Sequence, residues 1–351
     1  MIHFIPGGGN ALSTQPKSFI SSLFCLKTLC AFFVVCIHFS VFAPGLYPLI
    51  RTAVPAFFMI SGYFIYSSDR LKAISCCKRS LRKIILITVA ANLFYLPVQA
   101  GLFLAGGKVT LPQLNPESIL YFILVGDNIS AHLWYLTAYI QVLLVVFAVL
   151  VLKMENPLRT IIPLGMLAGL LFGTYSFLLP HYHPLYFLLS RNFLTIGIPF
   201  FGLGYLIRKY EPLIMQKKFR ILGHPAACLL FLILSVAEAR ALVLVSRGPL
   251  MGDILFFTIP LTVSLFLFCL QRPNLGRGSF VETIGKKYTT DIYIFHTFVG
   301  VAYGVMAKRL STLVPLPEML SPVFVFLLAL LFSILFKRLL SRLRLSLSPS
   351  E

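Results

Sequence analysis

Long apolar runs recur along the whole of this sequence, and they restrict the possible folds more than any other feature. A helix needs about 20 mostly apolar residues to cross the hydrocarbon core of a bilayer. Runs of this kind lie at residues 19–42, 47–67, 82–105, 133–153, 160–179, 185–207, 223–246, 251–270, 288–308 and 319–340. The sequence therefore predicts an all-α polytopic membrane protein, a bundle of about ten transmembrane helices.

The composition agrees with a bilayer as the main solvent. Hydrophobic residues make up 58% of the chain and charged residues only 12%, which does not describe the surface of a soluble protein. Lys and Arg outnumber Asp and Glu by 30 to 11. These cations lie in short clusters between the apolar runs, where membrane topology places them, so they favour membrane lipids as partners and argue against nucleic acid.

The basic clusters also predict an orientation, because short loops rich in Lys and Arg stay in the cytoplasm. Such clusters follow the second, sixth, eighth and last spans, while Lys308 and Arg309 are exceptions on the opposite side. We therefore expect both termini in the cytoplasm. We expect residues 1–18 to form an N-terminal tail, residues 19–340 a single transmembrane domain and residues 341–351 a C-terminal tail.

Ionisable side chains inside membrane spans are costly unless they are paired or hydrated, so each is a candidate functional residue. Lys27 and His38 share the first span, and their separation of eleven residues puts them on nearly the same helix face, about 16 Å apart along the axis. In the predicted orientation Lys27 lies in the inner half of the bilayer and His38 near the outer side. The other candidates are Arg51, His132, Arg191, Glu238, Arg240, Asp253, Asp291 and His296.

His38 is the strongest candidate for a catalytic group. Imidazole is the side chain best suited to take a proton from a hydroxyl near neutral pH. A carboxylate such as Glu238 or Asp253 would fix its tautomer, and an Arg or a His would stabilise an oxyanion. A lone histidine in a span is also commonly structural, with its ring donating to a backbone carbonyl, but the polar residues predicted at the same depth favour catalysis.

Two further motifs have both a structural and a functional interpretation. The aromatics Trp134 and Tyr135, next to His132, form either an interfacial belt or a site on which a substrate stacks. The cluster Lys78, Arg79, Arg82 and Lys83 either sets topology and contacts anionic lipid, or binds the phosphates of a nucleotide-containing acyl donor. Seven cysteines are present, and none has the spacing of a zinc site, so no metal is expected.

Several segments together resemble the acyltransferase-3 family of bacterial integral-membrane acyltransferases, which includes O-acetyltransferases that modify cell-surface polysaccharides. The resemblance covers nearly the whole chain. Its motifs are Val34-Val35-Cys36-Ile37-His38, the stretch Val54–Phe64, His132–Leu136 with Ala138-Tyr139, Arg191-Asn192-Phe193 leading to Gly197–Tyr205, and Ile284-Gly285 through Tyr293-Ile294-Phe295-His296.

The resemblance implies that His38 is the catalytic histidine and that His132, Arg191 and His296 belong to the family pattern. The family typically has an arginine ahead of the catalytic histidine in the same span, and Lys27 holds its place here. Lysine keeps the charge but lacks the planar fork of arginine. The resemblance also implies a bacterial inner-membrane enzyme that passes acetyl groups from cytoplasmic acetyl-coenzyme A to a cell-surface or lipid-linked glycan.

A secondary transporter or flippase is the alternative interpretation. Ten spans with polar residues near the midplane, together with the proline at Pro199, are also typical of transport proteins with broken helices. Such a fold is expected to carry a matching pair of interrupted helices, and the sequences around Pro55 and Pro199 are not similar. The sequence leaves the acceptor, the acyl length and the oligomeric state open.

Overall fold

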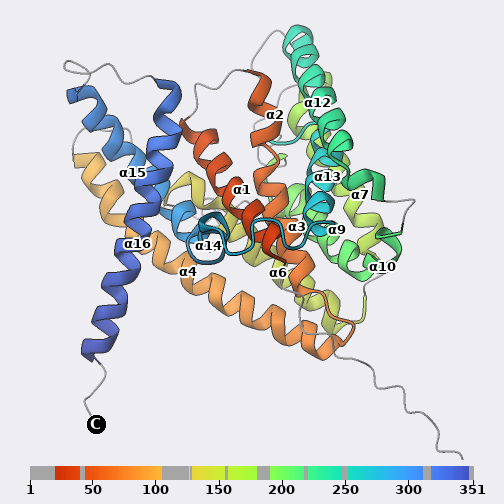
Figure 1. The fold of residues 1–351 in the computed structure, drawn as a ribbon, viewed down its shortest axis with the longest axis horizontal. Helices are drawn as coiled ribbons and strands as arrows, with labels where there is room; N and C mark the ends of the chain where they lie inside the picture. Colours follow the sequence, from red (N-terminus) through yellow and green to blue (C-terminus); the bar gives the residue numbers. More distant parts are fainter. Residues whose placement is uncertain are drawn as a thin grey trace, which may run out of the picture.

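The computed structural model describes residues 20–39, 44–104, 126, 129–154, 157–179, 190–216, 220–246, 252–310 and 318–347, and within these ranges the regular secondary structure is helical and no strand is present (Figure 1). The α-helices in chain order are α1 (Ser21–Phe39), α2 (Tyr47–Ile50), α3 (Ala53–Ile65), α4 (Arg70–Leu104), α6 (Trp134–Val151), α7 (Leu158–Gly169), α9 (Ile198–Lys209), α10 (Glu211–Ile214), α12 (Pro225–Ser246), α13 (Thr258–Leu270), α14 (Phe280–Lys287), α15 (Thr289–Leu310) and α16 (Ser321–Leu347). Short 3₁₀ or π turns connect or extend them, among them η2 (Ala131–Leu133), η3 (Leu170–Thr174) and η5 (Phe193–Gly197).

Among the described residues, 6 helical segments are long and apolar enough to cross a membrane: Ser21–Phe39, Tyr47–Ile65, Arg70–Leu104, Ala131–Val151, Pro225–Ser246 and Ser321–Arg342. Two shorter apolar helices are Leu158–Thr174 and Thr258–Leu270. The predicted all-helical, multi-pass membrane protein is thereby confirmed. The predicted spans at 185–207 and 288–308 correspond to α9 and α15, which are not among these helices. The count of about ten spans therefore stays a prediction. The cytoplasmic position of both termini stays a prediction as well.

The basic segment before the third predicted span differs from the sequence expectation. We expected a loop between residue 67 and residue 82, but Arg70, Lys72 and Lys78 all lie on α4, which runs unbroken for 35 residues. Leu, Lys and Arg are good helix formers, and the Asp69 carboxylate accepts hydrogen bonds from the N–H groups of Leu71 and Lys72 at 3.0 and 3.3 Å. These bonds hold the pKa of Asp69 below its usual value.

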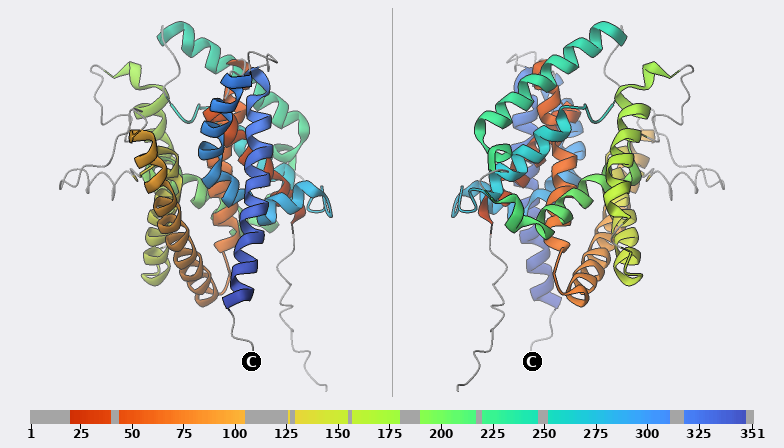
Figure 2. Two further views of the ribbon diagram at one scale, coloured as in Figure 1. Left: turned by 90° about the vertical axis from the view of Figure 1, so that its left-hand side faces the viewer. Right: turned by 90° about the vertical axis from the view of Figure 1, so that its right-hand side faces the viewer.

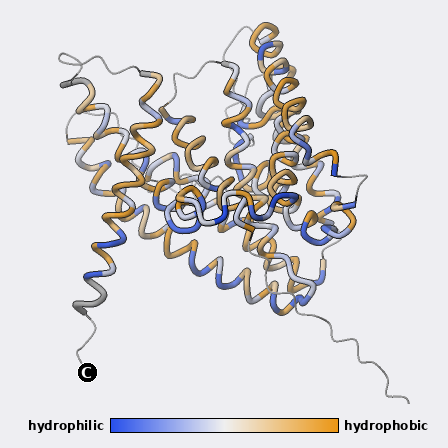
Figure 3. Tube along the Cα trace, in the orientation of Figure 1, coloured by the Kyte–Doolittle hydropathy of each residue, from blue (hydrophilic) through white to orange (hydrophobic). Residues whose placement is uncertain are grey.

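Helix α1 lies at the centre of the bundle. Helices α15 and α16 pack on one side of it, α3 and α13 contact it on the other, and α7, α9 and α12 extend that second side (Figures 1 and 2). The hydrophilic parts of the chain include the first half of α4, α10 and the lower part of α16 (Figure 3). Helix α16 continues to Leu347, so the predicted boundary between residues 340 and 341 falls inside it.

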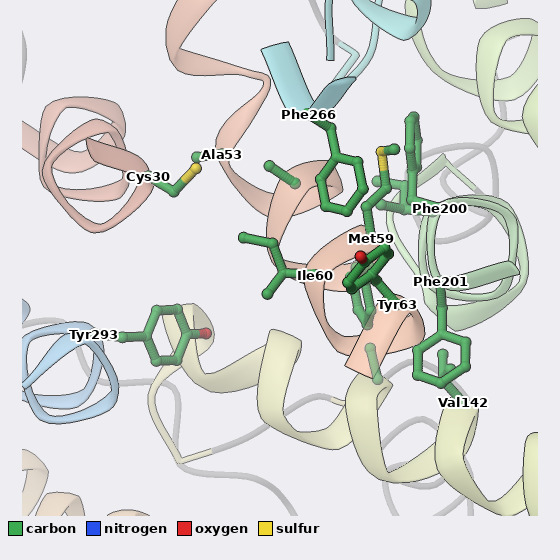
Figure 4. Packing of buried hydrophobic residues seen from close by; sticks show 14 of the residues in the cluster. Cys30, Ala53, Met59, Ile60, Tyr63, Val142, Phe200, Phe201, Phe266 and Tyr293 are labelled. Atoms are coloured by element: carbon green, nitrogen blue, oxygen red, sulfur yellow. The ribbon is translucent and has the colours of Figure 1, made fainter. Parts of the chain in front are cut away.

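Helices α3 and α9 touch through their backbones. A Cβ atom at Gly62 would overlap the carbonyl oxygen of Phe201, and one at Gly204 would overlap that of Met59. Around this crossing the side chains of Phe58, Met59, Phe200 and Phe201 are almost fully buried, and several of them appear in Figure 4. Small residues at a crossing allow this close approach, which supplies packing energy inside a membrane.

Candidate active site

Three histidines that are far apart in the sequence meet in the structure. His38 lies in the last turn of α1, His132 in η2, and His296 in α15. The ring centroid of His296 is 5.0 Å from that of His38 and 5.1 Å from that of His132, and the centroids of His38 and His132 are 6.3 Å apart. His38 is exposed, whereas the other two side chains are buried. We call these three residues the histidine cluster.

The hydrogen bonds of His132 define its tautomer. Its Nε2 lies 3.1 Å from the carbonyl oxygen of Ile294, which can only accept, so Nε2 carries the proton. Its Nδ1 then accepts from the hydroxyl of Ser130 at 2.9 Å. The hydroxyl of Tyr293 donates to the backbone carbonyl of His132, which ties η2 to α15. Both ring nitrogens of His132 are therefore occupied.

His296 has the opposite tautomer. Its Nδ1 lies 2.7 Å from the carbonyl oxygen of Tyr293 and 3.2 Å from that of Ile292, so Nδ1 carries the proton. The side chain is 0% exposed, and its Nε2 has no hydrogen-bond partner within the described part of the chain. The cluster thus contains one buried imidazole nitrogen whose lone pair is not engaged.

Hydroxyl groups that sequence reasoning missed surround the cluster. The hydroxyl of Tyr95 on α4 donates to the carbonyl of Ile294 at 2.7 Å and lies 2.7 Å from the hydroxyl of Thr297, which approaches His132 to 3.3 Å. Tyr293 is three residues before His296 and so lies on the same side of α15, a spacing that could have identified it. Tyr95 had no comparable signal, because its role depends on contact between two helices.

The predicted residues Arg51, Asp253 and Arg191 form one charged network, and Trp134 adjoins it. Asp253 pairs with Arg51 and, at 3.0 Å, with Nε of Arg191. The Arg191 guanidinium lies 4.8 Å from the centre of the Trp134 ring, within cation–π range. All three charged groups interact electrostatically with His38. They line a small cavity that also includes Ile37 and Pro55. The network carries one net positive charge beside the histidine cluster.

A larger cavity of about 470 Å³ lies among α1, α3, α4, α6 and α15. Its polar lining includes Lys27 and Lys83, and neither cation forms an ion pair with a described residue. Aromatic residues line other parts of it, including Tyr135 and Tyr293, whose ring centroids are 5.5 Å apart. We call this space the inner cavity, and its volume is that of a small-molecule site.

Tyr293 connects the inner cavity with the histidine cluster. The Tyr293 ring lines the cavity. The centroid of this ring lies 5.9 Å from the ring centroid of His132 and 6.1 Å from that of His296. Figure 4 shows the side chain reaching from α15 toward the neighbouring helix that begins near His132. The ring of Tyr293 therefore borders a space lined by two lysines and also lies beside two of the three imidazoles.

The other predicted residues lie apart from this arrangement. The carboxylate of Glu238 accepts from the hydroxyl of Tyr175 at 2.5 Å and from the N–H groups of Phe256 and Phe257 at 2.7 and 2.8 Å, just before α13. This is a helix-capping role, and no described contact joins Glu238 to His38. The side chains of Lys78, Arg79 and Arg82 are exposed on α4, and of that cluster only Lys83 lines the inner cavity.

No group of His, Cys, Asp and Glu in the described ranges is arranged to hold a metal ion. Two imidazoles of the histidine cluster donate hydrogen bonds to backbone carbonyls. This arrangement suits proton transfer and hydrogen bonding. An exposed imidazole beside two guanidinium groups can remove a proton from a hydroxyl and stabilise the negative charge that develops when the oxygen attacks a carbonyl.

A family model described as an acyltransferase domain matches residues 20–338, which is most of the chain and includes every residue of the histidine cluster and the inner cavity. No curated protein and no solved structure matches the chain.

Proposed function

Because the chain belongs to the acyltransferase-3 family of membrane acyltransferases, we propose that it transfers an acetyl group from cytoplasmic acetyl-coenzyme A to a hydroxyl of a cell-surface or lipid-linked glycan. The observation that carries this proposal is that Tyr293 both lines the ligand-sized inner cavity and lies beside His132 and His296 of the histidine cluster. A donor in the cavity would have its reactive end near the imidazoles.

The lining of the inner cavity fits an acyl-coenzyme A. Lys27 and Lys83 supply positive charge for phosphate groups. The two lysines repel each other, and an anion bound between them would relieve this repulsion. The aromatic wall, with Phe57 and Tyr135, suits the slender pantetheine arm, whose methyl and methylene groups can pack against aromatic rings. In this arrangement the thioester lies next to Tyr293.

In the proposed reaction His38 is the general base. It takes the proton from the acceptor hydroxyl as the oxygen attacks the thioester carbonyl, and a carbon–oxygen bond forms. The positive charge of Arg51 and Arg191 beside His38 stabilises the oxyanion. The carbon–sulfur bond then breaks, and the thiolate takes the proton from the His38 imidazolium. Direct transfer of this kind needs no acyl-enzyme, in keeping with the absence of a Gly-x-Ser-x-Gly motif from the sequence.

The acceptor would approach from the side of His38 that is exposed. Arg51 and Arg191, which are partly exposed, offer it hydrogen-bond donors, and the buried ring of Trp134 supports the Arg191 guanidinium from below. We further propose that the protein lies in a bacterial cytoplasmic membrane with both termini inside, so that the cavity faces the donor pool and His38 faces the acceptor.

The test uses membranes that contain wild-type protein, His38→Ala or the control His224→Ala, whose histidine is exposed in a turn away from the cluster. They are given radiolabelled acetyl-coenzyme A, and base-labile label is counted in glycan, lipid and small-molecule fractions. We expect label from wild type and His224→Ala and none above background from His38→Ala. Label that is independent of His38 in every fraction, or no label at all, would overturn the proposal and favour a transporter.

A further inference from the structure

We propose that His296 is the positioning residue for His38, with its Nε2 accepting a hydrogen bond from the His38 ring. This inference rests on the proposed function, in which His38 is the general base. In many catalytic sites a carboxylate holds the basic histidine in one tautomer. Here a second imidazole, fixed by the backbone of α15, takes that part.

The tautomer of His296 makes its Nε2 an acceptor. Its Nδ1 proton is committed to the carbonyl oxygen of Tyr293 at 2.7 Å, so the neutral ring has its lone pair on Nε2. That atom is buried and has no partner within the described ranges. A buried acceptor without a partner is unfavourable. A donor is therefore expected to bind there when the site is in its working arrangement.

His38 is the donor within reach. Its ring centroid lies 5.0 Å from that of His296, with the two planes inclined at 50°. Because His296 is anchored through Nδ1 to its own helix, the Nε2 edge of the ring points away from that anchor. His38 is exposed at the end of α1, so a rotation of its side chain can bring an N–H to this acceptor.

The other groups around His38 are already engaged. His132 uses both ring nitrogens, at Ile294 and Ser130. The charged groups that act on His38 are Arg191, Arg51 and Asp253, and Asp253 is paired with both arginines. The carboxylate of Glu238 accepts three hydrogen bonds elsewhere. Oδ2 of Asp253 also lacks a hydrogen bond, but it faces Nε of Arg191 at 3.0 Å in an ion pair. Among the described groups near His38, Nε2 of His296 is therefore the acceptor that neither a hydrogen bond nor an ion pair engages.

This hydrogen bond settles which nitrogen of His38 reacts. The nitrogen that faces His296 carries the proton, and the other carries the lone pair that takes the proton of the acceptor hydroxyl. The imidazolium so formed is stabilised because its original N–H still donates to His296. His296 neither gains nor loses a proton in this scheme, and the proton gained by His38 leaves with the thiolate.

The test compares His296→Gln with His296→Met. The amide oxygen of Gln can occupy the place of Nε2, while Met has similar length and no strong acceptor. We expect kcat to fall by roughly 100-fold or more in His296→Met and much less in His296→Gln, with KM for acetyl-coenzyme A little changed. The comparison is made at equal amounts of folded protein, judged by thermal unfolding in detergent.

The pH profile gives a readout that a structural role would not move. The unprotonated His38 is the active form, and His296 stabilises the protonated form. Without the acceptor His38 loses its proton more readily, so the acid limb of kcat/KM in His296→Met should move to lower pH by roughly one unit or more. The profile of His296→Gln should stay closer to wild type.

Equal rates and pH profiles for the Gln and Met variants would overturn the inference. If His296→Met does not fold, His296→Asn replaces it, because its shorter amide reaches only the place of Nδ1, and the same order of activities is expected. Wild-type protein that shows no His38-dependent transfer would instead overturn the proposed function, so the two failures are distinguishable.

Discussion

His38 and His296 lie side by side, with ring centroids 5.0 Å apart, although one belongs to the first described helix and the other to the last but one. Contacts between α1 and α15 hold the pair together. The positions of these imidazoles therefore depend on helix packing, so changes in the contacts that maintain the site should alter stability or transfer.

Asp253 is expected to be essential to the charged network beside His38. The change Asp253→Asn removes the carboxylate shared by Arg51 and Arg191, whose side chains are only 19% and 28% exposed, and leaves their charges unbalanced. We expect a loss of about 3 kcal/mol in the free energy of unfolding, measured by denaturation in detergent. The double variant Asp253→Asn with Arg191→Gln should lose less than the sum of the two single changes, and strict additivity would contradict the network.

Lys83 is expected to act in donor binding. The change Lys83→Glu places a negative charge in the inner cavity, so KM for acetyl-coenzyme A should rise by roughly tenfold or more while kcat changes little. The matched control is Lys72→Glu on the same helix, because Lys72 is 71% exposed and does not line the cavity. Equal KM values for the two variants would argue against a donor site in this cavity.

The hydroxyl of Tyr293 is expected to hold His132 in place. The change Tyr293→Phe removes its hydrogen bond to the His132 carbonyl and keeps the ring, so we expect a loss of about 1 kcal/mol of stability and a several-fold lower transfer rate. The control is Tyr303→Phe on the same helix, whose ring stacks on Phe324. If both variants behave alike in thermal unfolding and transfer assays, the hydroxyl of Tyr293 has no special role.

Gly62 is expected to tolerate no side chain. In Gly62→Ala the new methyl group meets the carbonyl of Phe201, so α3 and α9 must move apart, at a cost of about 3 kcal/mol or more. Gly304→Ala on α15 meets nothing within 4 Å and should be neutral or slightly stabilising, since alanine favours a helix over glycine. The measurement is the thermal unfolding of both variants in detergent. A Gly62→Ala protein as stable as wild type would contradict the backbone contact between α3 and α9.

Glu282 is expected to make stability depend on pH at the start of α14. The Ser21 hydroxyl, the Gly278 N–H and Lys286 favour its charged form and hold its pKa below the usual value. This contribution is fully present above the unfolded pKa of about 4.3 and is lost as the pH falls through the lower folded pKa. The stability difference between wild type and Glu282→Gln should therefore shrink below about pH 4. A difference that does not change between pH 7 and pH 3.5 would count against this prediction.

Sequence patterns predicted features that depend on one helix at a time. The spacing of Lys27 and His38 placed both on one side of the first span, and in the structure Lys27 lines the inner cavity while His38 joins the histidine cluster. The apolar runs predicted the long helices, because length and hydrophobicity decide whether a segment can cross a bilayer. The helical state of residues 70–81 was not predicted: its positive charge is typical of a cytoplasmic loop, whereas its Leu, Lys and Arg residues also favour a helix.

Contacts between helices were beyond the reach of those patterns. Both Glu238 and Asp253 were candidates to orient His38, and only packing decides that Glu238 turns to Tyr175 while Asp253 joins the arginines. Likewise the sequence of α4 alone does not distinguish Tyr95 from its other apolar-face residues. Its role follows from packing against α15, which places Ile294 and Thr297 within hydrogen-bond distance of its hydroxyl. Side-chain partners of this kind follow from the crossing of helices and not from periodicity.

The glycine-mediated crossing of α3 and α9 also bears on how the molecule can move. Two helices in backbone contact cannot slide or separate without losing that contact, so they behave as one rigid body. The inner cavity has α3 as one wall and α4 and α15 as others. Any widening that admits a bulky ligand must therefore come from displacement of the other walls, α1, α4, α6 or α15, against this stationary pair, and spectroscopic probes on those helices would report it.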